Sequence, residues 1–243
     1  LDESFALLHL ASRFLAPGAR YVCARADRPL PFGDRAFRSV FCSDALHDTG
    51  DPRGLARETL RVLDEGGTAF FVHLHNPAFP HPYPGRSPMR TEEYASAFDG
   101  GDPRLLDEAP ILESWIARRA LDLGAAAPPE ALSGSPTIAL LAGSRASDRA
   151  HSSAMPGRGR LCLAPLYDAA REGRGLRLDR RIPSETWARE YEALARYLPE
   201  TADLEAADLE ALREERIEGR VLDLFRTKVL LDLPDAYGAA RPW

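Results

Sequence analysis

Hydrophobic and polar positions in the first third of the chain alternate in an order that predicts a strand, a helix and a second strand. Arg38–Cys42 is a short run of β-forming residues, typical of a buried parallel strand. The apolar residues of Arg53–Leu63 recur at helical spacing, and Gly66–Gly67 suits a helix stop. Thr68–Leu74 is the next apolar run. These elements form a βαβ unit, in which ligands bind at the carboxyl ends of the strands.

Polar residues occupy both of these strand ends. Ser43–His47 follows the first strand and His73–Asn76 closes the second, so we look for chemistry in these two segments. His47 is a candidate general base, because the ordinary pKa of an imidazole lies near neutrality. The alternative is that His47 packs against its loop or caps it.

The histidines near the second strand do not have the spacing of a metal site. His73 and His75 share one face if residues alternate along the strand. The nearest third ligand, His81, lies in a proline-rich loop outside any familiar metal-site spacing, so we expect no bound metal. Instead we expect His75 and Asn76 to face a substrate and His73 to lie in the core.

The segments before this unit predict a helix and two strand pieces. Glu3–Ala16 has its apolar residues on one helical face, and Arg20–Ala24 has the pattern of a strand. Leu1–Asp2 looks like the end of a further strand. The expected apolar face of the helix comprises Phe5, Leu8, Ala11 and Leu15.

The middle of the chain predicts a loop, a helix and two short strands. Pro77–Pro88 is rich in proline and aromatic residues, which cannot pair as a strand or continue a helix. It is either a lid over a substrate cleft at the strand ends, with Phe79 and Tyr83 as substrate contacts, or an ordered surface loop. Leu105–Ala120 predicts a helix. Short strands are expected at Leu121–Leu123 and at Thr137–Ala142, the latter as an antiparallel edge strand.

A change of composition predicts the domain organisation. Gly143–Gly159 is rich in Ser, Gly, Ala and Arg, as linkers are. We expect an α/β domain at 1–144, a linker at 145–159 and an α+β appendage at 160–243 that packs on the sheet, covers the cleft or dimerises. The appendage pattern predicts a hairpin of Leu161–Tyr167 and Leu176–Arg181, then helices at Ser184–Tyr197 and at Leu204–Leu231 with an interruption near Gly219.

Composition excludes several classes of protein. With 44% hydrophobic and 28% charged residues, the chain belongs with globular proteins rather than disordered ones. No apolar run approaches the ~20 residues of a membrane span, so we expect no membrane partner. The net charge of −6 gives no basic footprint for nucleic acid. The three widely spaced cysteines predict buried thiols in a cytoplasmic protein rather than disulfides.

The motifs of the βαβ region resemble those of a known family. The chain reads LPF-x-D-x-x-F before the first strand, S-D-A-L-H after it and D-P-R-x-L-x-R-E-x-x-R-V-L-x-x-G-G-T through the helix. This pattern is similar to the central and C-terminal half of class I S-adenosylmethionine-dependent methyltransferases. The resemblance implies a Rossmann-like α/β sheet that lacks its first strands, S-adenosylmethionine as cofactor, and methyl transfer to a small or medium-sized acceptor.

The same resemblance implies where the cofactor lies. In the family an aspartate after the third strand accepts a hydrogen bond from the adenine amino group, and Arg25 stands at that position here. Because a guanidinium only donates, Arg25 cannot make this bond, and Asp27 is the candidate substitute. The cofactor-binding residues that the resemblance implies are Asp2, Arg25, Ala26, Asp27, Ser43 and Asp44.

The chain contains no G-x-G-x-G loop, which cradles the cofactor in this family. We therefore expect a fragment that lacks the first strand, this loop and the following helix. Two functions stay open at this point. The first is a methyltransferase in its complete form, with a small-molecule acceptor and either a monomeric or a homodimeric state. The second is a non-catalytic methyltransferase-like binding or scaffold protein.

Overall fold

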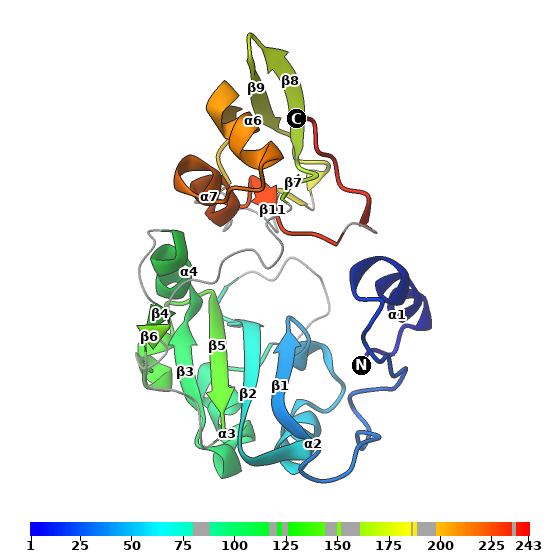
Figure 1. Cartoon of the computed structure of the whole chain (residues 1–243). Helices are drawn as coiled ribbons and strands as arrows, with labels where there is room; N and C mark the ends of the chain where they lie inside the picture. The colour runs from blue at the N-terminus through cyan, green and yellow to red at the C-terminus, as the bar shows by residue number, and fades with distance from the viewer. Residues whose placement is uncertain are drawn as a thin grey trace. The chain divides into compact units, whose positions relative to one another are not determined.

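The computed structural model describes residues 1–79, 88–116, 121–122, 126–143, 150–151, 161–185, 187–188, 198–234 and 237–243 (Figure 1). The chain divides into two compact units. The first, here called the α/β unit, comprises residues 1–8 and 21–153, and the second unit comprises residues 9–20 and 154–243. The predicted linker 145–159 and the predicted helix at Ser184–Tyr197 lie mostly outside the described residues.

The α/β unit is built on a four-stranded sheet with the strand order β1-β2-β5-β3 (Figure 1). The strands are β1 Phe37–Ser43, β2 Leu63–His75, β3 Arg104–Asp107 and β5 Thr137–Ala142. β1 and β2 are parallel and are joined by helix α2, Pro52–Val62, as the sequence predicts. β5 runs antiparallel to both β2 and β3. The sheet is therefore mixed, with the βαβ unit at one side.

Helix α2 begins for a local reason, but its predicted stop is not one. The Asp51 side chain accepts a hydrogen bond from the Gly54 backbone N–H at 2.8 Å, which caps the helix before Pro52. The prediction that Gly66–Gly67 stops the helix is wrong, because both glycines lie inside β2. They are among the additional residues that β2 has where its pairing with β1 shifts register, between Leu63 and Thr68. A Cβ atom at Gly67 would lie 2.9 Å from the Arg38 carbonyl oxygen, so only glycine fits this close approach.

One face of the sheet carries the core of the α/β unit. It is covered by α2, by helix α3 at Thr91–Ala97 with the 3₁₀ turn η3 at Asp99–Gly101, and by the 3₁₀ helix η4 at Pro129–Leu132. Apolar side chains from these helices pack against inward-facing residues of β2, β3 and β5. The largest fully buried members of this core are Leu46, Phe71, Leu74, Tyr94, Phe98, Ile138 and Leu140.

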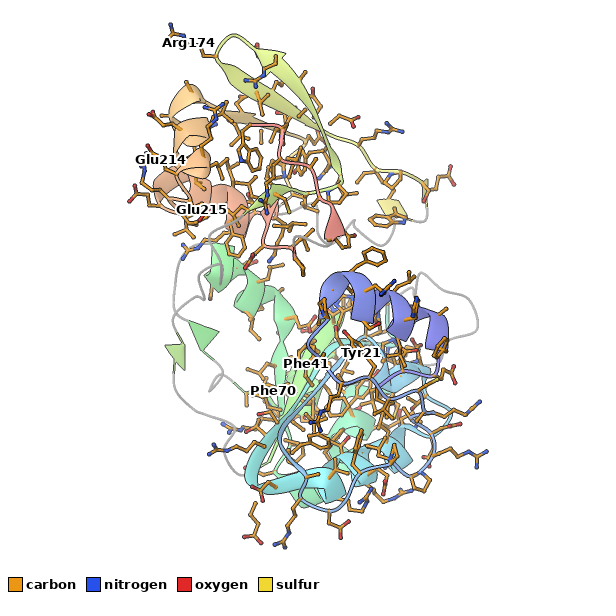
Figure 2. The ribbon with its side chains drawn as sticks, turned by 45° about the vertical axis from the view of Figure 1, so that its right-hand side comes forward. Tyr21, Phe41, Phe70, Arg174, Glu214 and Glu215 are labelled. Carbon is orange, nitrogen blue, oxygen red and sulfur yellow. The ribbon has the colours of Figure 1, made fainter. Side chains whose placement is uncertain are left out.

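The opposite face is only partly covered. Helix α4, Glu108–Ile116, packs Ile111 against Leu106 and Leu141. Farther along the sheet, Phe41 of β1 lies opposite Phe70 of β2 and is 68% exposed (Figure 2). The prediction of a buried strand is therefore wrong for β1, which has no fully buried residue, because only one of its faces meets the core.

The middle of the chain differs from the prediction in two places. The segment predicted as one helix, Leu105–Ala120, begins instead within strand β3, whose Leu105 and Leu106 pair with β5 before α4 starts. Strand β5 is antiparallel as predicted, but it lies between β2 and β3 and is not an edge strand. A separate short ladder joins β4, Leu121–Asp122, to β6, Ala150–His151.

The N-terminal segment is less packed than its pattern predicts. The helix α1 covers Phe5–Leu10 and continues as a π-helix, η1, over Ala11–Leu15. Of the predicted apolar face, only Leu8 is buried, whereas Phe5 is 72% exposed. Asp2 and Cys23 form an isolated parallel bridge, which is the described remnant of the two predicted strand pieces.

Besides η1, the described part of the second unit contains a three-stranded antiparallel sheet, the helices α6 and α7 and a short ladder. Its strands and helices are β7 Cys162–Leu163, β8 Tyr167–Glu172, β9 Gly175–Arg180, β10 Thr201–Leu204, α6 Ala206–Arg213, α7 Gly219–Arg226 and β11 Leu230–Leu231. The hairpin prediction is confirmed for its second arm, β9, but is wrong for its first arm, because β8 covers Tyr167–Glu172 and not Leu161–Tyr167. β7, which lies inside the predicted first arm, pairs with β11 instead. The predicted helix Leu204–Leu231 is interrupted before Gly219 as expected, but both of its ends are strands. Among the described residues no helix is long and apolar enough to cross a membrane.

Candidate functional site

Three side chains meet at the carboxyl ends of β1 and β2. Asp44 follows β1 directly, His47 lies in the 3₁₀ helix η2 at Leu46–Asp48, and His75 is the last residue of β2. The Oδ1 atom of Asp44 is 3.4 Å from Nε2 of His47 and 3.2 Å from Nε2 of His75. The two imidazole rings meet edge to face, with 4.9 Å between their centroids. The site thus lies where the βαβ prediction places it.

The backbone around these three residues is held in place by hydrogen bonds. Asp44 has a φ of 52°, in the left-handed region that aspartate tolerates better than most residues, and its N–H donates to the Val72 carbonyl at 3.0 Å. The Tyr94 hydroxyl, which is buried, donates to the His75 carbonyl at 3.1 Å. Sequence reasoning missed Tyr94, whose helical pattern shows only that it faces the core. The ends of β1 and β2 are therefore fixed relative to each other.

The electrostatics of the site keep Asp44 ionised. Partial burial raises the pKa of its carboxyl group, but the hydrogen bond from His75 and the charges of nearby histidines outweigh this effect. The pKa of Asp44 therefore lies below its ordinary value. The associated stabilisation is present above the ordinary pKa and is lost as the pH falls through the lower folded-state pKa. At neutral pH the site holds a negative charge between two imidazoles.

His47 and His75 differ in their access to solvent. The His47 side chain is 1% exposed, and its Nε2 also lies 3.7 Å from Oδ1 of Asp48. The His75 side chain is 16% exposed. This difference favours the packing alternative for His47, which was the candidate base, and makes His75 the better placed of the two histidines to reach a small molecule.

His73 does not lie in the core as predicted. Its φ of 59° interrupts the strand where the pairing of β2 with β5 shifts register between Phe71 and Leu74. Its side chain is 44% exposed, and its Nδ1 lies 3.3 Å from Oε2 of Glu108. The rings of His73 and His75 still lie 5.0 Å apart. Glu108 was missed from the sequence because it lies in a segment predicted as mid-helix.

Asn76 is engaged by its own loop. Its side-chain amide N–H₂ donates to the carbonyls of Leu132, Ser133 and Ser135 at 3.1–3.3 Å, and its Oδ1 accepts from the Ala78 N–H at 3.0 Å. The residue is only 6% exposed. This arrangement favours a structural role for Asn76, which ties the end of β2 to the loop before β5, over the predicted substrate contact.

The loop that the family resemblance assigns to adenine is closed by an ion pair. Arg25 donates from Nε and Nη2 to the two carboxylate oxygens of Asp27, at 2.8 and 2.6 Å. Ala26, between them, packs on the core of the α/β unit. Of the contacts that lower the pKa of Asp27, the hydrogen bond from Arg25 has the largest effect. The Asp27 carboxylate is therefore already engaged in the structure.

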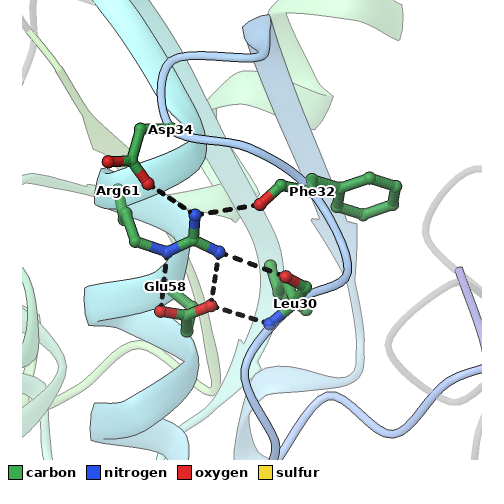
Figure 3. Close-up of polar contacts among 5 residues, drawn as sticks. All are labelled: Leu30, Phe32, Asp34, Glu58 and Arg61. Carbon is green, nitrogen blue, oxygen red and sulfur yellow. Dashed lines mark hydrogen bonds and ion pairs between the residues drawn. The ribbon is translucent and has the colours of Figure 1, made fainter.

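Farther along this loop, Arg61 and Glu58 of α2 hold the chain that leads into β1 (Figure 3). Arg61 donates to the carbonyls of Leu30 and Phe32 at 3.1 and 2.9 Å and to Oδ1 of Asp34 at 2.7 Å. Glu58 accepts from Arg61 and from the Leu30 N–H, at 2.7 Å each through Oε2. Sequence reasoning missed this pair, although its spacing of three residues on a helix is the signal that two side chains share a face.

The remaining predicted site residues lie as follows. Asp2 accepts a hydrogen bond from the Ser4 N–H at 2.7 Å, beside the start of α1. Ser43 is exposed at the end of β1, opposite Val72. Phe79 is partly buried in the turn after Asn76, whereas Tyr83 lies outside the described residues. Their assigned roles toward cofactor and substrate stay predictions.

Cys42, the residue before Ser43, gives a direct chemical test of how β1 packs on the core of the α/β unit. Burial raises the pKa of its thiol to about 11, against the weaker opposing effect of the Ala45 and Leu46 backbone N–H groups. Cys23 is exposed. Because only the thiolate reacts, we expect iodoacetamide near neutral pH to alkylate Cys42 about a hundredfold more slowly than an ordinary thiol, and Cys23 to react first. Peptide mass spectrometry measures both rates, and denaturant should make them equal. Equal rates in the folded protein would contradict the burial of Cys42.

A family model described as a methyltransferase domain matches residues 1–71. No curated protein matches the chain. Solved structures that resemble it include a SAM-dependent methyltransferase from Thermotoga maritima, at 15% identity and a TM-score of 0.41 over 58% of this chain and 70% of that one. The YcgJ protein from Bacillus subtilis is 20% identical, with a TM-score of 0.38 over 59% of this chain and 81% of that chain.

A methyltransferase candidate from Bacillus halodurans C-125 gives 18% identity and a TM-score of 0.37 over 58% of this chain and 78% of that chain. The family match ends at Phe71, in β2, so it covers β1, α2 and most of β2. It agrees with the motifs of the same segment and with the parallel pairing of β1 and β2. The resemblance to methyltransferases is confirmed for residues 1–71, which match the methyltransferase domain family, and the α/β unit has the predicted α/β sheet with a parallel βαβ unit.

Proposed function

We propose that the α/β unit takes part in S-adenosylmethionine-dependent methyl transfer to a small or medium-sized acceptor. The observation that carries the proposal is the meeting of Asp44, His47 and His75 at the carboxyl ends of β1 and β2, in a chain whose first 71 residues match a methyltransferase domain. Ligands of open α/β sheets bind at this edge.

The charge of the site fits the cofactor. S-adenosylmethionine carries a sulfonium and, when bound, supplies the methyl group. Asp44 is ionised and half exposed, so its carboxylate stabilises a cationic group placed beside it. Ser43, exposed beside it, adds a hydroxyl that can donate or accept a hydrogen bond.

The residues of this chain act mainly by positioning and by moving one proton. Methyl transfer requires the acceptor atom in line with the methyl group, so an exact alignment contributes more than any one side chain. His75 Nε2 lies 3.2 Å from Asp44 Oδ1, so the imidazole is held beside the carboxylate at the strand ends. We propose that this imidazole accepts the proton of an acceptor hydroxyl or amine as the bond to carbon forms.

A non-catalytic methyltransferase-like scaffold is the second candidate function. The ion pair of Arg25 with Asp27 favours it, because this pair engages the carboxylate that would otherwise accept from adenine. Losing one such hydrogen bond costs about 1–3 kcal/mol, which weakens the cofactor without excluding it. Methyl transfer is therefore retained as the first candidate.

We also propose the class of acceptor, the cellular location and the oligomeric state of the protein. The net charge of −6 favours a small-molecule acceptor over nucleic acid, and nothing in the apolar pattern favours a membrane surface. We place the protein in the cytoplasm because its cysteines are free in the structure. A homodimer is tested directly by light scattering of the purified protein.

Calorimetric titration of the full-length gene product with S-adenosylhomocysteine tests the proposed function. We expect one binding site per chain. In the matching titration with S-adenosylmethionine, whose sulfonium is cationic, we expect Asp44→Ala to weaken binding by about tenfold or more because the charged partner of the sulfonium is lost. Glu214→Ala, an exposed change in the second unit, is the matched control and should leave the affinity unchanged (Figure 2). Absence of any binding heat at high ligand concentration would exclude methyl transfer and favour the scaffold.

A further inference from the structure

We propose that Asp44, His47 and His75 form a binding site for one divalent transition-metal ion of the zinc type. Each of the three offers one ligand atom, and these atoms all lie within 4.8 Å of one another. Among the residues that the structure describes, this is the one group of His, Cys, Asp or Glu side chains gathered so closely. Sequence reasoning did not find it, because it weighed His73, His75 and His81, which are close in the chain, and not residues on different strands.

The distances between the ligand atoms fit a metal sphere. Zinc lies about 2.0–2.1 Å from imidazole nitrogen and carboxylate oxygen, so two ligands at tetrahedral positions lie about 3.3–3.4 Å apart. The Asp44 Oδ1 atom is 3.4 Å from Nε2 of His47 and 3.2 Å from Nε2 of His75. Two of the three separations thus match those of ligands on one tetrahedral ion, and the third, between the ligand atoms of the two histidines, is at most 4.8 Å.

The chemistry of the ligands selects the type of ion. Two imidazoles and one carboxylate suit zinc, cobalt or iron, whereas magnesium and calcium prefer oxygen ligands alone. Asp48, whose Oδ1 lies 3.7 Å from Nε2 of His47, adds a second negative charge near the site. The local charge is therefore negative when the imidazoles are neutral, which is the form that binds a cation.

The supporting contacts hold two of the three ligands in place before an ion arrives. The buried Tyr94 hydroxyl fixes the His75 carbonyl, and the Asp44 N–H is bonded to the end of β2. The His47 side chain is 1% exposed and has little freedom to turn away. Such preorganisation lowers the entropic cost of binding an ion.

The site is open on the side of Asp44, whose side chain is 48% exposed. Three protein ligands with one open side are the arrangement of metal sites that also bind a small molecule. A bound ion would take an anionic or hydroxyl oxygen in the open position. This last step rests on the proposed function and specifies its acceptor as one that bears such an oxygen, whereas metal binding itself does not depend on methyl transfer.

The same geometry has a simpler explanation, in which Asp44 accepts a hydrogen bond from His75 and lies beside His47 without any ion. Metal titration of the purified full-length protein, freed of metal with a chelator, separates the two. We expect one Co²⁺ ion per chain with the visible absorption of a tetrahedral or five-coordinate site, displaced by Zn²⁺, and no comparable binding of Mg²⁺ in calorimetry.

Variants locate the ion. Asp44→Ala and His75→Ala change the two more exposed ligands, so the fold should survive, and each should weaken Zn²⁺ binding at least about a hundredfold. His73→Ala is the matched control, a neighbouring histidine outside the group, and should change the affinity less than about threefold. Far-ultraviolet circular dichroism checks that each variant is folded.

Two results would overturn the proposal. The first is the absence of a Co²⁺ or Zn²⁺ site in the wild-type protein. The second is equal affinity in the wild type, Asp44→Ala and His75→Ala, since the ion would then lie elsewhere. S-adenosylhomocysteine titration of the same metal-free and metal-loaded samples keeps the two proposals apart: metal binding without cofactor binding refutes the proposed function alone, and the reverse refutes the metal site alone.

Discussion

Replacing Phe71 with alanine should lower the free energy of unfolding of the α/β unit by about 3–5 kcal/mol. Phe71 is 1% exposed in the middle of β2, and its ring packs edge to face on Phe98, with 4.8 Å between the centroids. Its Cα partners are Cys42 in β1 and Leu140 in β5, so the cavity would open under both neighbouring strands. A domain is stable by only about 5–15 kcal/mol, so this one change approaches complete unfolding.

Phe41→Ala is the matched control for this prediction. Phe41 is the same residue type on the neighbouring strand, but it is 68% exposed on the other face of the sheet (Figure 2). Its loss should cost less than about 0.5 kcal/mol. Hydrogen exchange of the amides in β2 and β5 measures the stability of this unit separately from the second unit. If the two variants lost equal stability, the assignment of the core to one face of the sheet would be incorrect.

Replacing Asn76 with aspartate should be nearly as damaging, by about 3–5 kcal/mol at neutral pH, because it leaves an uncompensated charge in a buried position. The new carboxylate could only accept hydrogen bonds, and it would face the carbonyl oxygens of Leu132, Ser133 and Ser135, which also only accept. The loss should shrink as the pH is lowered, because a protonated carboxyl group can donate to one of these carbonyls.

Asn76→Ala separates the charge from the missing hydrogen bonds. It removes the donors without adding a charge, so it should cost about 1–3 kcal/mol and show no such dependence on pH. Chemical denaturation at neutral and at mildly acidic pH measures both variants. A wild-type stability for Asn76→Asp would show that Asn76 does not hold the loop before β5, and would restore a free side chain for the predicted contact with a substrate.

The parts of the fold that the sequence predicts well are those with a local cause. The βαβ unit was predicted within about two residues at most boundaries, because Asp51 and Pro52 mark the start of α2 and its apolar residues repeat at helical spacing. The glycine pair after α2 misled the prediction, because Gly66 and Gly67 serve a register shift between strands, which depends on the partner strand β1.

The parts that could not be predicted depend on distant residues. The apolar residues Leu105 and Leu106 fit the pattern of a helix as well as that of a strand. Only their pairing with β5 shows that they belong to strand β3. The three carbonyls that Asn76 bonds lie 56 to 59 residues away in the chain. Likewise, strand-end positions predicted that Asp44 and His75 share an edge of the sheet. They did not predict that His47 and His75 both lie close to the same Asp44 oxygen, or that His47 is buried there.

The central claim is that the cofactor binds at the carboxyl ends of β1 and β2. Hydrogen–deuterium exchange of the full-length protein, with and without S-adenosylhomocysteine, tests this location directly. We expect slower exchange in the presence of the ligand at residues 43–48 and 73–76, where Asp44, His47 and His75 meet. Unchanged exchange in both segments, or protection confined to residues 161–243, would contradict it.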